Sequence, residues 1–405
     1  MTGSDRTPDP SAAPSTGAAP STGAAAGPGA GGRPRVAVVF GGRSSEHGIS
    51  CVTAGGVLAA IDPTAYDVVA IGIARDGRWV LEQSGAERWS IAAGDASQAE
   101  ALLPSVDGAR PTVTLTRASS GTDLLVSEAS RPPEAFGEVD VVFPVLHGPW
   151  GEDGTIQGML EMAGVRYVGA GVLASAVSMD KAYMKVVLAA AGLPVMPGIT
   201  VTATQWAADA ADVRARVADL RHPVFVKPAR GGSSMGVAKV RSADELDAAL
   251  EVAFEHDPRV LVEVSAQDAR EVECGVLQRL DGGTETTRPA EIHVDAAHDF
   301  YDFEAKYLPG QATEIDLPAD LPADVEAQVR SLSAQAFEAV GCEGLARVDF
   351  FVQPDGSLIV NEINTMPGFT PTSMFPQMWA KSGLDYPALV DRLLQLALRR
   401  GTGLR

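Results

Sequence analysis

The chain has 405 residues and a net charge of −20, which disfavours electrostatic binding to nucleic acid or to an anionic membrane. Its 45% hydrophobic and 21% charged residues are typical of a globular protein, and its length allows two or three domains. Cys51, Cys274 and Cys342 are widely spaced and show no metal-ligand pattern, which favours a reducing, cytoplasmic compartment. No apolar run reaches the length of a membrane span. We therefore expect a protein that binds neither nucleic acid nor membrane.

The beginning of the chain predicts a disordered tail followed by an α/β domain. Residues 1–33 are mainly Ala, Gly, Pro, Ser and Thr, and they lack the apolar core of a secretory signal. Beyond them, the apolar runs Arg35–Phe40 and Val139–Leu146 each end in glycine and predict buried strands. A helix capped by Ser50 and reaching about Ala60 is expected after the first strand. Such strand–loop–helix units indicate parallel strands.

This first domain is expected to cover residues 34–178, with the polar, Gly- and Ser-rich stretch 82–135 as a variable insertion. Ligands of such domains bind beyond the carboxyl ends of the parallel strands. Glu46 and His147 both follow a predicted strand, so they are candidates for a ligand site.

The next segment, residues 179–262, has features of a phosphate-binding domain. Its loop Arg230–Gly236 lies between two predicted strands, and its glycines allow backbone N–H groups to approach an anion. Lys227 precedes the loop on its strand, and Lys181 lies in the first turn of a helix predicted from Asp180 to Ala191. The alternative interpretation is a flexible hairpin loop with surface lysines.

The most informative feature is a predicted hairpin from Arg347 to Asn364 that turns at Asp355-Gly356. A two- or four-residue turn centred there places Asp349 directly opposite Glu362, and Arg347 opposite Asn364. Opposed carboxylates repel each other, and oxygen ligands from Asp, Glu and Asn suit a hard cation such as Mg²⁺. The alternative is a surface hairpin whose solvated carboxylates pair with Arg347.

Three other segments of the last domain, residues 263–405, carry candidate binding groups. Glu263 closes an apolar strand, and a buried acid there needs a donor such as a nucleotide amino group. Phe300–Tyr307 has the composition of a lid, and Pro367–Ser373 offers donors to a carboxylate. An exposed strand end, a surface loop and a bare turn are the competing interpretations. Together with the lysines and the Gly-rich loop, an acidic metal site beside Arg347 indicates phosphoryl transfer.

These segments resemble, in the same order, the successive motifs of the D-alanine–D-alanine ligase family. The matching stretches are Gly41-Gly-Arg-Ser-Ser-Glu-His-Gly-Ile-Ser50, His147-Gly-Pro-Trp-Gly-Glu-Asp-Gly-Thr155, Ser178-Met-Asp-Lys181, Val226-Lys-Pro-Ala-Arg-Gly-Gly-Ser-Ser234, Glu304-Ala-Lys-Tyr307, Ala346-Arg-Val-Asp349 and Asn361-Glu-Ile-Asn-Thr-Met-Pro-Gly368. The resemblance covers roughly residues 34–400.

The resemblance implies an ATP-grasp fold of the α/β (α+β) class, with three domains and ATP between the central and C-terminal ones. It implies a ligase in which ATP phosphorylates the carboxylate of a first D-alanine. The amine of a second D-alanine then attacks the acyl phosphate and releases D-alanyl-D-alanine for peptidoglycan synthesis. The family also implies a homodimer and two Mg²⁺ ions, for which Mn²⁺ can substitute.

The same resemblance implies roles for single residues. Those implied for ATP are Lys181, Lys227, Gly232, Ser233, Ser234, Glu263, Val264, Glu271 and Phe351. The implied metal ligands are Asp349, Glu362 and Asn364. Arg347 and the backbone N–H of Gly368 are implied to stabilise the charged tetrahedral intermediate.

The substrate residues are implied in the same way. Glu46 receives the ammonium of the first D-alanine beside His147, and Ser373 and the Met374 backbone bind the carboxylate of the second. Lys306 and Tyr307 lie on the lid, and Glu46, Ser233 and Tyr307 form a hydrogen-bonded triad in the closed state.

One position departs from the family pattern, and another bears on the choice of acceptor. Val264 stands where relatives often have lysine, which affects the adenine contacts. Tyr307 favours an amine acceptor, because the vancomycin-resistance relatives that make D-alanyl-D-lactate lack this tyrosine. The alternatives are a related ligase that uses D-lactate or D-serine as second substrate, and a catalytically inactive ATP-binding regulatory protein.

Overall fold

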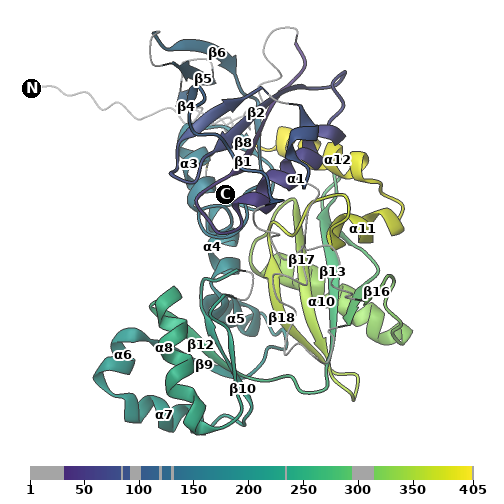
Figure 1. Cartoon of the computed structure of the whole chain (residues 1–405). Helices are drawn as coiled ribbons and strands as arrows, with labels where there is room; N and C mark the ends of the chain where they lie inside the picture. The colour runs from purple at the N-terminus through teal and green to yellow at the C-terminus, as the bar shows by residue number, and fades with distance from the viewer. Residues whose placement is uncertain are drawn as a thin grey trace, which may run out of the picture.

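Three sheets organise the computed structural model (Figure 1). The structure describes residues 32–83, 85–91, 102–117, 121–128, 132–232, 235–293 and 314–403. The predicted tail therefore lies almost wholly outside the described residues, and so do Ser233, Ser234, Lys306 and Tyr307.

The N-terminal sheet has eight strands in the order β6-β5-β4-β3-β2-β1-β7-β8. Their bounds are β1 Arg35–Gly41, β2 Asp67–Ile73, β3 Trp79–Glu82, β4 Thr112–Arg117, β5 Thr122–Ser127, β6 Glu134–Glu138, β7 Val141–Pro144 and β8 Arg166–Tyr167. β1, β2, β7 and β8 pair in parallel, which confirms the predicted parallel core. The antiparallel strands β4 and β5 and the first residues of β6 come from the stretch 82–135, which is expected to be a variable insertion, and they extend the sheet on one side.

The buried Ser50 holds the first helix of this domain in place. The helices of the domain are α1 His47–Ala60, η1 Ala86–Trp89, α3 Thr155–Ala163 and α4 Val172–Met179. The prediction that Ser50 caps α1 is wrong, because the helix begins at His47 and Ser50 is buried inside it. The Ser50 hydroxyl donates to the Val145 carbonyl at 2.7 Å and accepts from the Gly41 N–H at 2.8 Å. These bonds hold the start of α1 against the ends of β1 and β7.

The central sheet has four strands in the order β11-β10-β12-β9. The elements are α5 Lys181–Ala190, β9 Gly198–Thr202, α6 Ala203–Ala208, α7 Ala210–Ala218, β10 Val224–Pro228, β11 Ala238–Val240, η3 Ala243–Glu245, α8 Leu246–His256 and β12 Arg259–Val264. The Gly-rich loop Arg230–Gly236, called the Gly/Ser loop below, joins the antiparallel strands β10 and β11, as predicted. The Asp180 carboxylate caps α5 by accepting from the N–H groups of Ala182 and Tyr183.

The third sheet has the order β16-β15-β13-β17-β18, with β14 paired to β13. Its elements are β13 Arg270–Gln278, β14 Thr284–Thr286, β15 Ala290–His293, β16 Glu314–Asp316, α10 Ala323–Ala339, β17 Leu345–Val352, β18 Leu358–Asn364, α11 Met374–Lys381 and α12 Tyr386–Arg399. Helix α12 lies beside α1 in Figure 1, and Leu389 and Leu393 share a buried core with Val36 and Phe40 of β1. The end of the chain therefore packs against the N-terminal domain.

The hairpin of β17 and β18 has the predicted pairing at the site but not near the turn. Asp349 lies opposite Glu362, as expected. The turn contains three residues, Pro354–Gly356, since the Gln353 N–H donates to the Ser357 carbonyl and Gly356 has a φ of +84°. A bulge between Asp349 and Phe350 then shifts the register by one residue. The bulge offsets the different turn and restores the predicted pairing at the site.

Candidate active site

A cavity of about 280 Å³ opens between the central and third sheets and is bounded by loops of the N-terminal domain. The predicted site residues that line it are Glu46, His147, Lys181, Lys227, Gly232, Glu263, Val264, Glu271, Arg347, Asp349, Phe351, Glu362, Asn364 and Gly368. Ser373 and Met374 do not line it and lie at the N-terminus of α11. Residues from distant parts of the chain are thus brought to one place.

Arg347 is the centre of the acidic wall of this cavity. Its guanidinium donates to both oxygens of Asp349, each at 2.7 Å, and lies 3.2 Å from Glu273. Burial opposes the charge of Arg347, but Asp349 and Glu273 outweigh that effect and raise its pKa well above the usual value. Sequence reasoning missed Glu273. The signal was its alternation with Glu271, since residues two apart on β13 share a face.

The donor set at the end of the hairpin fits a divalent cation. Asp349, Glu362 and Asn364 offer two carboxylates and an amide oxygen on one face of the sheet, and oxygen ligands of this kind suit Mg²⁺. The Asn364 amide donates to Asp349 at 3.0 Å, and the Lys181 ammonium lies 3.6 Å from Glu362. The carboxylates are therefore balanced here by cationic side chains and an amide.

Two lysines form the basic wall. The Lys181 ammonium donates to the Gly231 carbonyl at 2.7 Å, beside the Gly/Ser loop. Lys227 lies 2.5 Å from one oxygen of Glu263, whose other oxygen is 2.8 Å from Lys185. Burial acts to raise the pKa of Glu263, but the two lysines outweigh it and hold the pKa at about 2. Glu263 is thus a buried group that stays ionised because two lysines contact it.

Lys185 is a second residue that sequence reasoning missed. It lies on α5 one helical turn after Lys181, and this spacing places both side chains on one face of the helix. Burial lowers the pKa of Lys185, and Glu263 offsets part of that effect. The charge of Lys185 therefore depends on its carboxylate partner.

The N-terminal domain contributes a third wall around Glu46. This residue is 7% exposed and immediately precedes α1. A Cβ added to Gly148 would lie 2.5 Å from a Glu46 carboxylate oxygen, and one added to Gly232 would lie 3.0 Å from it. Both loops therefore approach this carboxylate closely, and the φ of +74° at Gly148 favours glycine there.

His147 and Glu152 complete this wall. The His147 Nε2 lies 3.1 Å from the Thr53 hydroxyl, and burial lowers the pKa of this histidine while Glu46 offsets part of the change. Glu152, which sequence reasoning did not single out, accepts from the Gly148 N–H at 2.6 Å. Burial and the neighbouring Glu46 raise the pKa of Glu152 to about 8.

Ser373 and Met374 lie at the start of α11, outside the cavity lining. The Ser373 hydroxyl accepts from the Thr370 N–H at 3.1 Å and lies 2.7 Å from the Thr370 hydroxyl. Helix N-termini favour anions, so this position remains suited to a substrate carboxylate.

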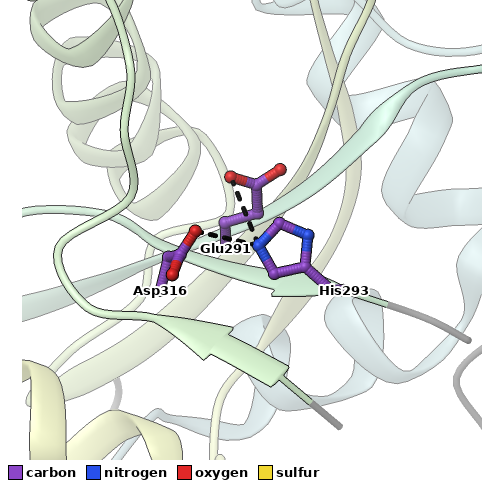
Figure 2. A group of neighbouring side chains, drawn as sticks. All are labelled: Glu291, His293 and Asp316. Carbon is purple, nitrogen blue, oxygen red and sulfur yellow. Dashed lines mark hydrogen bonds and ion pairs between the residues drawn. The ribbon is translucent and has the colours of Figure 1, made fainter.

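A separate group of ionisable side chains lies at the edge of the third sheet. Figure 2 shows the His293 ring directed at the carboxylates of Asp316 and Glu291, at 2.9 Å and 4.0 Å from its Nε2. Arg270 donates to both oxygens of Glu291, at 2.7 Å and 2.5 Å. Because Glu291 already has this cationic partner, we interpret the group as an ion-pair cluster rather than a metal site.

Comparison with protein families agrees with the geometry. Residues 35–170 match the family model for the D-ala D-ala ligase N-terminus, and residues 187–395 match that for the C-terminus. The chain belongs to the D-alanine–D-alanine ligase family. It is 57% identical over 377 residues to the D-alanine–D-alanine ligase of Arthrobacter sp. (strain FB24), covering 92% of this chain and 96% of that relative. The ligase of Streptomyces griseus is 55% identical, with 92% and 95% covered.

Solved structures of the family have the same fold. The VanG D-Ala:D-Ser ligase of Enterococcus faecalis superposes with a TM-score of 0.75 at 34% identity, covering 90% of this chain and 100% of that one. The D-alanine–D-alanine ligase of Coxiella burnetii gives 0.72 at 33% identity, with 90% and 94% covered. The predicted ATP-grasp fold is confirmed, and the protein is an enzyme of the ligase class that uses ATP and a divalent metal ion.

Proposed function

We propose that the protein joins two D-alanines into D-alanyl-D-alanine for peptidoglycan synthesis, through a D-alanyl phosphate. One observation carries the proposal: a single cavity unites two lysines beside a Gly-rich loop, an acidic hairpin with an arginine, and the buried carboxylate of Glu46. These are groups that phosphates, divalent cations and an ammonium require, respectively. A catalytically inactive regulatory protein is disfavoured, because Arg347, Asp349, Glu362 and Asn364 are all present and converge.

The basic wall would bind ATP. Lys181 and Lys227 would contact its phosphates, together with backbone N–H groups of the Gly/Ser loop, including Gly232, Ser233 and Ser234. The adenosine part would lie along residues of β12, β13 and β17, which are Glu263, Val264, Glu271 and Phe351.

The acidic wall would hold two Mg²⁺ ions, for which Mn²⁺ can substitute. Asp349, Glu362 and Asn364 are the residues that would bind them. Bound there, the ions would neutralise charge on the phosphate oxygens and orient them for in-line transfer. For this, Asp349 would have to exchange some of its contacts with Arg347 and Asn364.

Glu46 would bind the ammonium of the first D-alanine, with His147 beside it. The substrate carboxylate would then face the phosphate site on the opposite side of the cavity, where it attacks the γ-phosphate of ATP. This attack breaks the bond to ADP and leaves an acyl phosphate, which has a good leaving group.

The second D-alanine would bind through its carboxylate to Ser373 and the Met374 backbone at the start of α11. Its free amine would attack the acyl carbon, and the developing oxyanion would be stabilised by Arg347 and the Gly368 N–H. The tetrahedral intermediate would then break its bond to the phosphate oxygen and release inorganic phosphate, while the attacking nitrogen loses a proton and becomes the amide of the dipeptide. We further propose that Lys306 and Tyr307 act on a lid and that Tyr307 joins Glu46 and Ser233 in a triad.

Domain division, assembly and location are part of the proposal. We propose domains at residues 34–178, 179–262 and 263–405, because each includes one of the three sheets, apart from short overlaps at the boundaries. A homodimer is supported by apolar side chains that face solvent on α3 and α4, such as Met162 at 88% and Leu173 at 66% exposure. Light scattering on the purified protein tests the dimer.

Among the described residues, no helix is long and apolar enough to cross a bilayer. For the location of the protein, we propose the cytoplasm.

An acceptor competition tests the function. ATP, Mg²⁺ and D-alanine are supplied alone or with D-serine or D-lactate, and the products are identified by mass spectrometry. We expect D-alanyl-D-alanine as the main product at neutral pH. The VanG ligase, a D-Ala:D-Ser enzyme by name, shares the fold at 34% identity, so a preference for D-serine or D-lactate would refute the acceptor assignment. Absence of ATP turnover would refute the whole proposal.

A further inference from the structure

Glu263 is held from two sides by two lysines that differ in their access to the cavity. Lys227 and Glu263 both line the cavity, and Lys227 approaches one carboxylate oxygen at 2.5 Å. Lys185 approaches the other oxygen at 2.8 Å from helix α5 and is not among the residues that line the cavity. The side chains of Glu263 and Lys185 are 3% and 9% exposed. Lys185 therefore contacts Glu263 on the side away from the cavity and does not line the cavity itself.

We infer that Lys185 is a positioning residue that keeps Glu263 neutralised when Lys227 turns from Glu263 to the phosphates of ATP. This inference rests on the proposed function, because it assumes that Lys227 binds phosphate. It adds a role for Lys185, which would act through Glu263 and Lys227 without touching the nucleotide.

The physical reason is the cost of an unpaired buried carboxylate. Glu263 lies on the apolar strand β12, opposite Phe225 on β10. A buried charge that loses its partner is strongly destabilised. If Lys227 were the sole partner of Glu263, phosphate binding would leave the carboxylate without a cation. Because Lys185 remains at the second oxygen, Lys227 can change partners without that cost.

The arrangement also accounts for the different environments of the two lysines. Burial lowers the pKa of Lys185, whereas for Lys227 the nearby Glu263, Glu362 and Glu271 outweigh burial and raise the pKa. Lys227 is thus a cation in a largely acidic setting beside the cavity. Lys185 has Glu263 as its partner at 2.8 Å, so neutralising both side chains together leaves neither a carboxylate nor a second lysine without a partner, and Lys227 keeps the nearby Glu362 and Glu271.

The test measures kinetics with ATP, Mg²⁺ and D-alanine for Lys185→Met, Glu263→Gln and the double variant. We expect Lys185→Met to raise the KM for ATP by about 5- to 150-fold, the range expected when a buried charged acceptor loses one partner. The KM values for D-alanine should change by less than about 2-fold, since the first proposed D-alanine site lies at Glu46 and the second at the start of α11, neither of which contains Lys185 or Glu263. Adding Glu263→Gln should return the KM for ATP toward the Glu263→Gln value, because a neutral amide needs no cation.

Two controls separate this role from a loss of folding. Lys381→Met makes the same change at an exposed lysine at the end of α11 and should leave the KM for ATP unchanged. If Lys185→Met does not fold, Lys185→Gln keeps a polar side chain without the charge, and Lys185→Arg keeps the charge. Lys185→Gln should raise the KM for ATP, and Lys185→Arg should have a KM for ATP close to that of the wild type.

The outcomes distinguish this inference from the proposed function. An unchanged KM for ATP in both Lys185→Met and Lys185→Gln overturns the inference, and so does a defect that Glu263→Gln does not relieve. A parallel rise in the KM values for ATP and D-alanine also overturns it, because that pattern indicates general disruption. If Lys227→Met leaves the KM for ATP unchanged, the phosphate role of Lys227 fails as well, and both proposals are overturned at this site.

Discussion

Replacing Arg347 by methionine should abolish most of the activity and weaken the fold around the hairpin. The variant keeps the apolar stem of the side chain but removes the cation that Asp349 and Glu273 share. If this cation stabilises the charged intermediate, its loss should lower kcat by about 10²- to 10³-fold, the usual effect of losing one oxyanion donor.

The stability loss follows from the geometry. The Arg347 side chain is 13% exposed and makes two 2.7 Å contacts with Asp349 and one of 3.2 Å with Glu273. Desolvation offsets much of the attraction in such a group, but removal of one partner leaves buried carboxylates uncompensated and costs about 3–5 kcal/mol. Glu362 also interacts favourably with the charge of Arg347, so without the arginine it adds to the repulsion among the carboxylates.

Two measurements check this expectation. Urea unfolding without substrates gives the stability loss, and initial rates with saturating ATP and D-alanine give kcat. Arg347→Lys is the matched control, because it keeps the charge but lacks the planar guanidinium whose two nitrogens each donate to one oxygen of Asp349. We expect its unfolding midpoint and kcat to fall between those of the wild type and Arg347→Met. A methionine variant with the wild-type kcat would refute the catalytic role, and a wild-type unfolding midpoint would refute the reasoning about the buried charges.

Three further predictions concern single groups. Glu362→Gln should lower Mg²⁺-dependent activity by at least about 100-fold, by analogy with the loss of a preorganised electrostatic contact. The circular dichroism spectrum should be unchanged, and normal turnover would show that the metal assignment is wrong. Tyr307→Phe, outside the described residues, should increase the use of D-lactate relative to D-alanine as acceptor, and an identical acceptor ratio would contradict the triad. The hydrogen bond with Asp316 raises the pKa of His293, so NMR titration should give a value above 6.5 that falls in Asp316→Asn. The stabilising effect of this pair should be complete below the unfolded-state pKa and should disappear as the pH rises through the folded-state pKa; an Asp316→Asn effect on stability that is the same at pH 5 and pH 9 would contradict it.

The hairpin shows how far local pattern can predict a site. Alternation along β17 and β18 correctly placed Asp349 opposite Glu362 and Arg347 opposite Asn364. It did so with the wrong turn, because the three-residue turn ends at Gly356 in a left-handed conformation. The bulge that compensates between Asp349 and Phe350 has no signal in the alternation along β17, since buried and half-buried residues alternate through it without a break.

The residues that were missed share a different property. Lys185 and Glu273 contact charged groups from distant segments of the chain, and Glu152 accepts from the nearby Gly148 N–H while Glu46, from a distant segment, raises its pKa. Helical spacing predicts that Lys185 shares a face with Lys181, but it does not indicate that Glu263 lies there. Ser50 failed as a cap for a related reason, because the ends of β1 and β7 provide its partners. Spacing predicts faces, whereas only the packed fold decides which faces meet.

The ion pairs explain how a chain of net charge −20 can bind a polyanion. Lys227 contacts Glu263, Lys181 lies near Glu362, and Arg347 contacts Asp349. Each cation proposed to act on phosphate or on the intermediate is thus beside a carboxylate, and Asp349 and Glu362 are proposed metal ligands. Under the proposed function, ATP and Mg²⁺ would replace these ion pairs. Phosphate oxygens would become the partners of the lysines, and the metal ions would become the partners of the hairpin carboxylates. Neither set of charges would then be left buried without a partner, which is why the two ligands should bind more tightly together than separately.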